Sequence, residues 1–448
     1  MITARFEITN RCNLKCPSCY SGRANYLNQH PVFKYASLEL CEKIYKKLKS
    51  FDKNIEMKLY QLNEPLLHPD LNGVLDLNDK YDLPCCISSN IIIKKDWVQL
   101  LAHKSLRRFI ISTSGCFSNS YPLGHRGGDT ALFLKHLNEL ALAAKTSSTE
   151  IEVIFHQYND NEKDEKYLSS FCYENGFTFT PIPAFIMYSP WDNACKYRGK
   201  EKEQLDIATN VIPRIILQKN FLIENIPGLG MLPCMNESKN DIAIDTEGYV
   251  QHNCCMVPFS EEHRAGHILD LSFEETQQIQ KKLSICLDCK KKGYHMQYGL
   301  IPHIEYTYLA RTRASSHSEV NINESIRSFL RSPLPPKKIQ NTPIYVYGLI
   351  GGERIIRLLQ AKGCIVAGII DDNPRLTGVE CEGYPVLNME QASSTDNFRK
   401  GTVIICFIRS PEQIKVIKNN LLEKGVAQAL SLYELFVSAK DDRVTQQA

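Results

Sequence analysis

The feature that most constrains the fold is a regular alternation of β-rich runs with helix-like segments between residues 2 and 185. Six runs have the Val, Ile, Phe and Tyr content of strands: residues 4–10, 55–61, 83–89, 107–113, 151–157 and 177–183. Each is followed by a helical pattern or a connecting segment. Because strands that alternate with helices pair in parallel, the pattern predicts a parallel α/β barrel or partial barrel.

Helix boundaries in this region follow from their terminal residues. Ser37 is expected to cap a helix that carries Cys41, Ile44 and Leu48 on one face. Asp129 is expected to cap a second helix, and Gly176 to end a third, because glycine adopts the left-handed conformation of a helix C-terminus. In a parallel sheet, functional groups gather at the carboxyl ends of strands.

The rest of the chain divides into further parts. Residues 186–310 are expected to form a connection and then a cysteine-rich α+β unit, with a hairpin around residues 241–255. The polar stretch 311–342 predicts a linker. Buried-strand patterns interleaved with helices then predict a Rossmann-like, doubly wound α/β domain over residues 343–448.

Composition excludes several function classes. The chain has 448 residues and a formal net charge of +3, with interspersed cations, which predicts two or three ordinary globular domains and neither a nucleic-acid nor a membrane partner. No export signal precedes the first strand, so we expect a cytoplasmic protein. Its 17 cysteines are therefore expected to stay reduced, which favours metal ligation over disulfides.

Three cysteines follow the first strand closely, at the spacing C-x3-C-x2-C: Cys12, Cys16 and Cys19. A structural zinc site and a saturated four-iron cluster each take four ligands. Three thiolates on a cubane cluster would leave one iron open to an outside chelator. Zinc stays an alternative, although the spacing matches neither zinc fingers nor ferredoxins.

This triplet after a first strand resembles the signature of the radical SAM superfamily, whose fold is a partial (β/α)6 barrel of the TIM type. The resemblance implies that Cys12, Cys16 and Cys19 hold a 4Fe-4S cluster. It further implies that S-adenosylmethionine (SAM) chelates the open iron and is cleaved by one electron to a 5'-deoxyadenosyl radical. An electron donor such as flavodoxin or ferredoxin is then an implied partner.

Other segments resemble SAM-contacting parts of the same family. "NEPLLHPDL" is similar to its Gly-Glu-Pro segment, which makes Glu64 the expected partner of the SAM amino group, with Asn63 in the place of the usual glycine. "IISTSG" resembles the fourth-strand segment near the ribose and carboxylate, which implies Ser112 and Ser114. "LGHRGG" implies Arg126. The alternative for each is ordinary turn or surface chemistry.

A second cysteine set resembles the SPASM or twitch extension of these enzymes. It combines a cysteine, an Asp-x-x-Gly-x-Val hairpin, a Gly-x-Ile turn and a C-x2-C pair. The implied ligands of one auxiliary 4Fe-4S cluster are Cys234, Cys254, Cys286 and Cys289, with Cys255 as an alternative to Cys254. A zinc ribbon is the competing interpretation, because C-x2-C pairs occur in both.

The last domain carries a damaged dinucleotide fingerprint. Gly348, Gly351 and Gly352 do not make G-x-G-x-x-G, because Ile350 stands where the backbone would approach a pyrophosphate. NAD binding, binding of a nucleotide or sugar, and a scaffolding role stay open.

The expected activity is that of an oxidoreductase or other radical SAM enzyme that modifies a small molecule or carbohydrate. The short segment before Cys12 favours this slightly over maturation of a ribosomal peptide. A non-catalytic iron-sulfur or zinc module is the third possibility. Cys116 and Cys195 are weak candidates for returning a hydrogen atom to a substrate radical, and His68 and His156 for acid–base roles, although free thiols and structural histidines are commoner.

Overall fold

The computed structural model covers the 448 residues of the chain. The described residues are 2–28, 32–52, 54–184, 214, 241–252, 254, 259–280, 283–284, 286–287, 329, 332, 334–348, 352–374, 376–406 and 411–436. They divide into two compact units: Met1–Ile215 with Asn236–Leu287, and Ile216–Met235 with Asp288–Ala448.

An eight-stranded sheet forms the first unit, with the order β6-β5-β4-β3-β2-β1-β7-β8. Its first six strands are β1 (Ile2–Phe6), β2 (Ile55–Lys58), β3 (Cys85–Ser89), β4 (Leu106–Thr113), β5 (Glu150–Gln157) and β6 (Thr178–Pro183). These six strands pair in sequence order, and every pair is parallel. The predicted parallel α/β partial barrel is confirmed.

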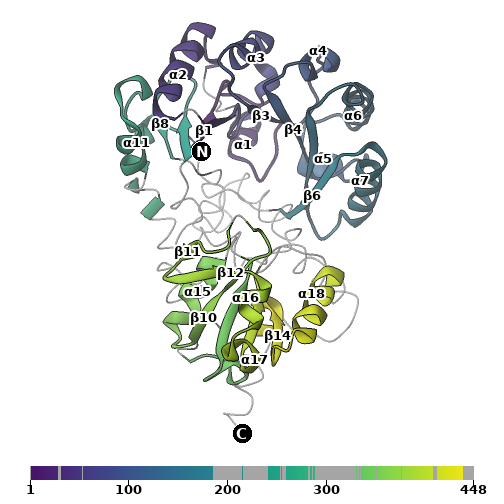
Figure 1. The fold of residues 1–448 in the computed structure, drawn as a ribbon. Helices are drawn as coiled ribbons and strands as arrows, with labels where there is room; N and C mark the ends of the chain where they lie inside the picture. Colours follow the sequence, from purple (N-terminus) through teal and green to yellow (C-terminus); the bar gives the residue numbers. More distant parts are fainter. Residues whose placement is uncertain are drawn as a thin grey trace, which may run out of the picture. The chain divides into compact units, whose positions relative to one another are not determined.

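The outer side of this sheet is covered by α2 (Leu38–Phe51), α3 (Leu71–Lys80), α4 (Trp97–Leu101), α6 (Thr130–Ala144) and α7 (Glu162–Asn175) (Figure 1). The connections after β1, β2 and β4 contain the shorter α1 (Tyr20–Tyr26), the 3-10 turn η1 (Pro65–Leu67) and α5 (Tyr121–Gly124). The three expected helix ends are confirmed: Ser37 accepts the amide of Leu40, Asp129 accepts that of Leu132, and Gly176 has a φ of 69°.

One hydrophobic core lies between these helices and the strands. It buries Ile44 and Leu48 of α2 together with alternate residues of β1, such as Ala4 and Phe6. Burying such side chains is the main stabilising term of the unit, at about 25 cal/mol for each Å² of apolar surface. The core fixes the carboxyl ends of the strands, where the loops that carry the site begin.

The cysteine-rich region adds to this same sheet. β7 (Asp241–Ile244) pairs in parallel with β1 and turns back antiparallel into β8 (Val250–Gln251), with Gly248 at a φ of 86° in the turn. The turns η5 (Glu261–His263) and η6 (Ile268–Asp270) and helix α11 (Phe273–Gln280) follow. The expected hairpin is confirmed, but its strands extend the barrel sheet, whereas the sequence analysis assigned them to a separate unit.

The second unit contains a six-stranded sheet with the order β11-β12-β10-β9-β13-β14. Its elements are η8 (Lys337–Ile339), β9 (Pro343–Tyr347), α15 (Gly352–Ala361), β10 (Ile365–Ile370), β11 (Glu380–Cys381), β12 (Tyr384–Leu387), α16 (Met389–Ser393), α17 (Asp396–Lys400), β13 (Thr402–Ile405), α18 (Pro411–Glu423) and β14 (Gln428–Ser431). All pairs except β11–β12 are parallel. In chain order the five parallel strands lie 3-2-1-4-5, which is the Rossmann arrangement.

Part of the stretch expected to be a linker packs on this second unit. Phe329 is 1% exposed and contacts Phe436, with ring centroids 4.9 Å apart. The Lys362 ammonium donates to the carbonyl oxygens of Phe329 and Ser332. The polar composition of residues 311–342 gives no local sign of these contacts.

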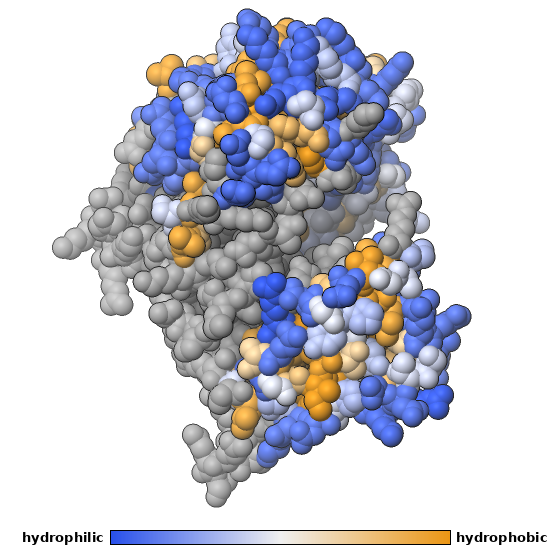
Figure 2. Space-filling model, turned by 60° about the vertical axis from the view of Figure 1, so that its left-hand side comes forward, coloured by the Kyte–Doolittle hydropathy of each residue, from blue (hydrophilic) through white to orange (hydrophobic). Residues whose placement is uncertain are grey.

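Within the described residues, no helix has the length and apolar character needed to cross a membrane. Figure 2 shows that the described surface on one face is mostly hydrophilic, with smaller apolar areas between the charged side chains.

Candidate functional site

The loop that follows β1 carries the three cysteines. Cys19 is the N-cap residue of α1, and its amide donates to the carbonyl of Cys16 over 3.3 Å. From within α1, the Asn25 amide donates to the carbonyls of Cys12 and Leu14, over 2.5 and 2.8 Å. The short helix α1 and its N-cap therefore hold the backbone of the cysteine loop at three carbonyls.

Gly22 allows α1 to approach this loop. A Cβ at this position would lie 2.4 Å from the backbone nitrogen of Cys16 and 2.5 Å from its carbonyl oxygen. Only glycine fits such a close backbone approach. The spacing between Cys16 and Gly22 is therefore part of the site's construction.

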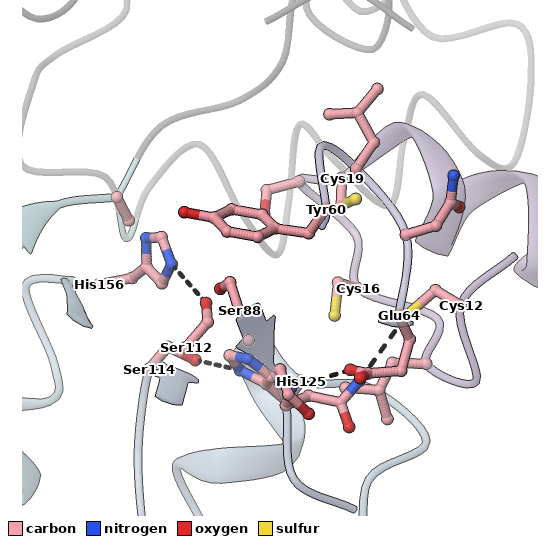
Figure 3. A pocket seen from close by; sticks show the side chains of 18 of the residues that line it. Cys12, Cys16, Cys19, Tyr60, Glu64, Ser88, Ser112, Ser114, His125 and His156 are labelled. Carbon is pink, nitrogen blue, oxygen red and sulfur yellow. Dashed lines mark hydrogen bonds between the residues drawn. The ribbon is translucent and has the colours of Figure 1, made fainter. Parts of the chain in front are cut away.

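All three cysteines line one cavity of about 260 Å³ at the carboxyl end of the sheet. Figure 3 shows that side chains from the carboxyl ends of β3, β4 and β5 and from the loops after β1, β2 and β4 surround the same space. Besides the cysteines, the wall consists of Leu14, Ser18, Tyr60, Gln61, Leu62, Asn63, Glu64, Ser88, Ser89, Asn90, Ser112, Ser114, Gly124, His125, His156, Tyr158 and Ala184. The expected carboxyl-end location of the site is thereby confirmed.

The spacing of the three thiols fits a cluster better than a single ion. Among the described residues, their sulfur atoms do not all lie within 4.8 Å of one another. A tetrahedral zinc ion with bonds of about 2.3 Å would hold them about 3.8 Å apart. Burial raises the pKa of each thiol, and the neighbouring thiols raise those of Cys12 and Cys16 further. Three thiolates therefore need a positively charged group between them, and a four-iron cluster fits this donor set.

Glu64 lies beside the cysteine loop (Figure 3), and its backbone amide donates to the carbonyl of Arg11 over 3.0 Å. Its carboxylate accepts the backbone amides of Leu66 and Asn90, over 3.0 and 2.9 Å, and it is 2% exposed. Burial raises the pKa of this carboxyl to about 7, against the lowering effect of those two amides. The Asn90 side-chain amide lies 3.7 Å from the Cys12 sulfur, so this segment connects the carboxylate to the thiols.

The buried carboxylate of Glu7 is hydrogen-bonded to the same segment. Its carboxylate accepts the amides of Leu62 and Asn63, the latter over 2.8 Å, and is 3% exposed. The Asn63 side chain in turn accepts the Ser21 hydroxyl over 2.8 Å. Asn63, where the resembled family has glycine, thus bridges the Glu64 segment and the start of α1 while lining the cavity.

Two serine–histidine pairs form the far wall. The Ser112 hydroxyl lies 3.1 Å from Nε2 of His156, and the Ser114 hydroxyl lies 2.9 Å from Nδ1 of His125. Burial lowers the pKa of His156 to about 4 and that of His125 to about 3. Both imidazoles are therefore neutral near pH 7, so they exchange single hydrogen bonds without adding charge to the cavity.

The neutral state of His125 makes stability depend on pH. In the unfolded chain a histidine takes up a proton below about pH 6.5, while the buried one does not, so stability falls as pH falls. Between about pH 7.5 and pH 5 this residue should cost about 2 kcal/mol of unfolding free energy. Urea unfolding of the metal-free protein at both pH values should show a weaker pH dependence in His125→Asn. An unchanged pH dependence would contradict the assignment.

The expected cofactor contacts divide into two groups. Asn63, Glu64, Ser112 and Ser114 line the cavity, so the structure brings them together with the three cysteines. Arg126 is not among the lining residues. Its guanidinium lies over the ring of Tyr26, 5.0 Å from the centroid, and its carbonyl accepts the amide of Lys15. A direct contact of Arg126 with a ligand in the cavity therefore has no support here.

The weak catalytic candidates differ in where they lie relative to the cavity. Cys116 is fully buried, its amide donates to Asp164 over 2.6 Å, and its side chain does not line the cavity. Its buried position gives the proposed hydrogen-atom donor no contact with the cavity. Cys195 lies outside the described residues. His68 donates or accepts at the Ala36 carbonyl over 2.9 Å and is 1% exposed, as a structural histidine would be.

The second cysteine set is only partly described. Cys254 and Cys286 are half-buried in the first unit, and the amide of Cys254 lies 3.4 Å from Nδ1 of His252. Cys234, Cys255 and Cys289 lie outside the described residues. The auxiliary cluster therefore stays a prediction.

In the Rossmann-like unit, the expected nucleotide end is occupied by its own side chains. The Tyr347 hydroxyl donates to Asp372, and Asp371 accepts the amide of Asn373 over 2.9 Å. Gly348 has a φ of 99°, as a Gly turn after the first strand requires, while residues 349–351 lie outside the described part. A nucleotide or sugar ligand of this unit stays a prediction.

Sequence reasoning missed several residues of the site. It did not single out His125, Tyr158 or Gly22, and it weighed an acid–base role for His156 against the commoner structural one. Asn90 and His156 could be predicted as site residues because they lie at the carboxyl ends of predicted strands. Nothing local marks Gly22 or Tyr158, because their roles come from contacts with segments distant in the sequence.

The first unit is thus a parallel half-barrel with a three-thiol cavity at the carboxyl ends of its strands. No protein-family model and no curated protein matches the chain. Among solved structures, it is similar to anSMEcpe with bound AdoMet, at 16% identity and a TM-score of 0.42 over 65% of this chain and 88% of that chain.

Two further solved structures are similar at the same level. BtrN in complex with AdoMet and 2-DOIA matches at 16% identity and a TM-score of 0.39, over 65% of this chain and 87% of that one. Streptococcus suis SuiB bound to S-adenosylmethionine matches at 13% identity and a TM-score of 0.41, over 65% of this chain and 71% of that one. Sequence identities and TM-scores this low carry no argument about function.

Proposed function

We propose that this chain is a radical SAM enzyme. One observation carries the proposal: three thiols from one loop line a single cavity together with a buried carboxylate that two backbone amides orient. A four-iron cluster bound there would supply one electron to cleave SAM into methionine and a 5'-deoxyadenosyl radical, which abstracts a hydrogen atom from the substrate.

The chain's own residues would position the SAM molecule. Glu64 would accept a hydrogen bond from the amino group of SAM, because its carboxylate is fixed and faces the cavity. Ser112 and Ser114 would bind the polar parts of its ribose or carboxylate, and each hydroxyl is already oriented by a neutral histidine. These contacts would hold the reacting atoms in place and keep water out of the cavity.

We place the substrate among small molecules or carbohydrates. The cavity wall also contains Tyr60, Ser88 and Asn90, whose hydroxyl and amide groups are not assigned to SAM. Such neutral polar groups suit a hydroxyl-rich, uncharged substrate. A ribosomal peptide is the alternative substrate, since a side chain entering the cavity could present the same groups.

A second cluster would belong to the same enzyme. We keep Cys234, Cys254, Cys286 and Cys289 as its four ligands, with Cys255 in place of Cys254 as the alternative, and an electron-accepting role for the cluster they hold. Free thiols and reduced clusters both suit the cytoplasm, where we place the protein.

The test of the function is SAM cleavage. Protein reconstituted with iron and sulfide under anaerobic conditions is expected to bind about eight iron atoms, and to release 5'-deoxyadenosine when SAM and dithionite are added. Deuterium transfer from labelled sugars, polyols or peptides into that product identifies the substrate class. A protein that binds zinc instead, or that binds iron but leaves SAM intact, would contradict the enzyme and support a binding module.

A further inference from the structure

Tyr158 is an aromatic residue of the cavity wall that has no role so far. It directly follows β5, is 3% exposed and lines the cavity together with the three cysteines. Burial raises the pKa of its phenol, whereas a hydrogen bond with the side chain of Ser18 lowers it. Ser18 lies between Cys16 and Cys19 in the sequence. The ring of Tyr158 therefore connects the end of β5 to the cysteine loop.

A residue distant in the sequence holds this ring. Arg214 belongs to the stretch between β6 and β7, and its guanidinium lies over the ring of Tyr158, 4.3 Å from the centroid. Its Nε and Nη2 donate to the two carboxylate oxygens of Asp160, over 2.6 and 3.0 Å. Its carbonyl accepts the amide of Asn159 over 2.8 Å. Side-chain and backbone contacts thus hold Arg214 against residues 158–160.

The geometry of these contacts fixes the guanidinium. A bidentate bond to a carboxylate sets the plane of an arginine head group, and a cation over a tyrosine ring is attracted to its face. The side chain of Arg214 is 12% exposed, so solvent screens these interactions little. A lysine could make the ion pair but not the planar, two-bond contact. We call Asp160 and Arg214 the Tyr158 clamp.

From these contacts we propose that Arg214 and Asp160 are positioning residues of the SAM site, which hold the ring of Tyr158 in place as a wall of the cavity. The inference rests on the proposed function, because it takes SAM as the molecule that fills this cavity. A molecule of that size fills a cavity of about 260 Å³ and meets each of its walls. A wall that is already fixed need not be ordered on binding, which raises affinity.

Both clamp residues act through Tyr158. Neither Arg214 nor Asp160 is among the residues that line the cavity. Their substitution should therefore change the affinity for SAM only as far as it releases the ring. This dependence separates a positioning role from a direct contact with the ligand.

The test uses three single variants and one matched control. Tyr158→Leu removes the ring, Arg214→Gln removes the cation and its bidentate bond, and Asp160→Asn removes the partner charge without changing its shape. The control is Arg357→Gln. Arg357, in α15 of the second unit, makes a similar bidentate pair with Glu382, over 2.7 Å at each bond. Its loss removes an ion pair of the same kind far from Tyr158 in the sequence.

The first readout is the dissociation constant for SAM. It is measured by equilibrium dialysis on anaerobically reconstituted protein without a reductant, so that no SAM is cleaved. We expect it to rise about tenfold in Tyr158→Leu and about fivefold in Arg214→Gln and in Asp160→Asn, and to stay unchanged in Arg357→Gln. Unchanged binding in Arg214→Gln, or an equal loss in Arg357→Gln, would overturn the proposal.

A double variant separates positioning from general destabilisation. If Arg214 acts through the ring, Arg214→Gln should weaken SAM binding no further once Tyr158→Leu is present, although it still lowers the unfolding midpoint. Single effects that multiply to about fiftyfold would contradict this route. Tyr158→Phe keeps a ring beneath the guanidinium, so it should bind SAM within about twofold of the wild-type protein.

The same assay distinguishes the two ways of being wrong. A wild-type protein that binds iron but no SAM would refute the proposed function and this inference with it. A wild-type protein that binds and cleaves SAM, with clamp variants that bind it equally well, would refute the inference alone.

Discussion

Replacing Cys16 with alanine is expected to remove the iron bound at the first cysteine set and to reduce 5'-deoxyadenosine formation to background. Cys16 lies between Cys12 and Cys19 in the loop, and it lines the cavity with them, so its thiolate is one of the three expected ligands. Two remaining thiolates cannot hold a four-iron cluster whose fourth iron is already open. The iron bound at the second cysteine set should remain, so the total iron content per chain should fall by about half.

The control for this variant is Cys364→Ala. Cys364 is a half-buried thiol of the second unit that follows α15, and its loss should leave iron content and SAM cleavage unchanged. Iron and sulfide per chain, measured after identical anaerobic reconstitution, decide the result. A Cys16→Ala protein with wild-type iron would show that the first three cysteines hold no cluster.

Replacing Gly22 with alanine is expected to have nearly the same effect, although the side chain touches no ligand. Its Cβ would lie 2.4, 2.5 and 2.9 Å from the nitrogen, oxygen and Cα of Cys16. These are backbone atoms that cannot rotate away, so either α1 or the loop must move. Overpacking of this kind costs about 1–3 kcal/mol, and the displaced loop should no longer hold three thiolates in register.

Gly425→Ala separates the displacement of the loop from general destabilisation. Gly425 belongs to the second unit, has a φ of 93°, and has open space around its Cα. An alanine there is strained by its backbone conformation, at a cost of about 1 kcal/mol, but it contacts nothing. Gly22→Ala should lose iron while Gly425→Ala keeps it, at comparable shifts of the unfolding midpoint. Equal iron in the two variants would contradict the steric argument.

The local signals of the chain predicted most of the first unit. The six strands, the capping roles of Ser37 and Asp129, and the left-handed Gly176 follow from side-chain chemistry within a few residues, which is why they were readable. The parallel order of the strands also followed, because a helix between two strands allows little else. The three cysteines were placed for the same reason, directly after the first strand.

The pairing of strands that are distant in the sequence could not be predicted from such local signals. The strand β7 joins β1 across more than two hundred residues of chain, and the sequence analysis assigned it to another unit. The short strands β11 and β12 of the second sheet were not expected either, because two to four residues give no period to recognise. Phe329 looked like part of a polar linker until its ring was seen buried beside Phe436.

By itself, the sequence determined the chemistry available to this protein: three thiols at one loop, a carboxylate and two serines on later loops, and the parallel sheet that carries them. Only the tertiary structure decided how these groups meet. It brought His125 and His156 to Ser114 and Ser112, and it left Cys116 and Arg126 outside the set of residues that line the cavity. The physical reason is that residue type sets what a group can bind, whereas burial and distance depend on segments that are remote in the chain.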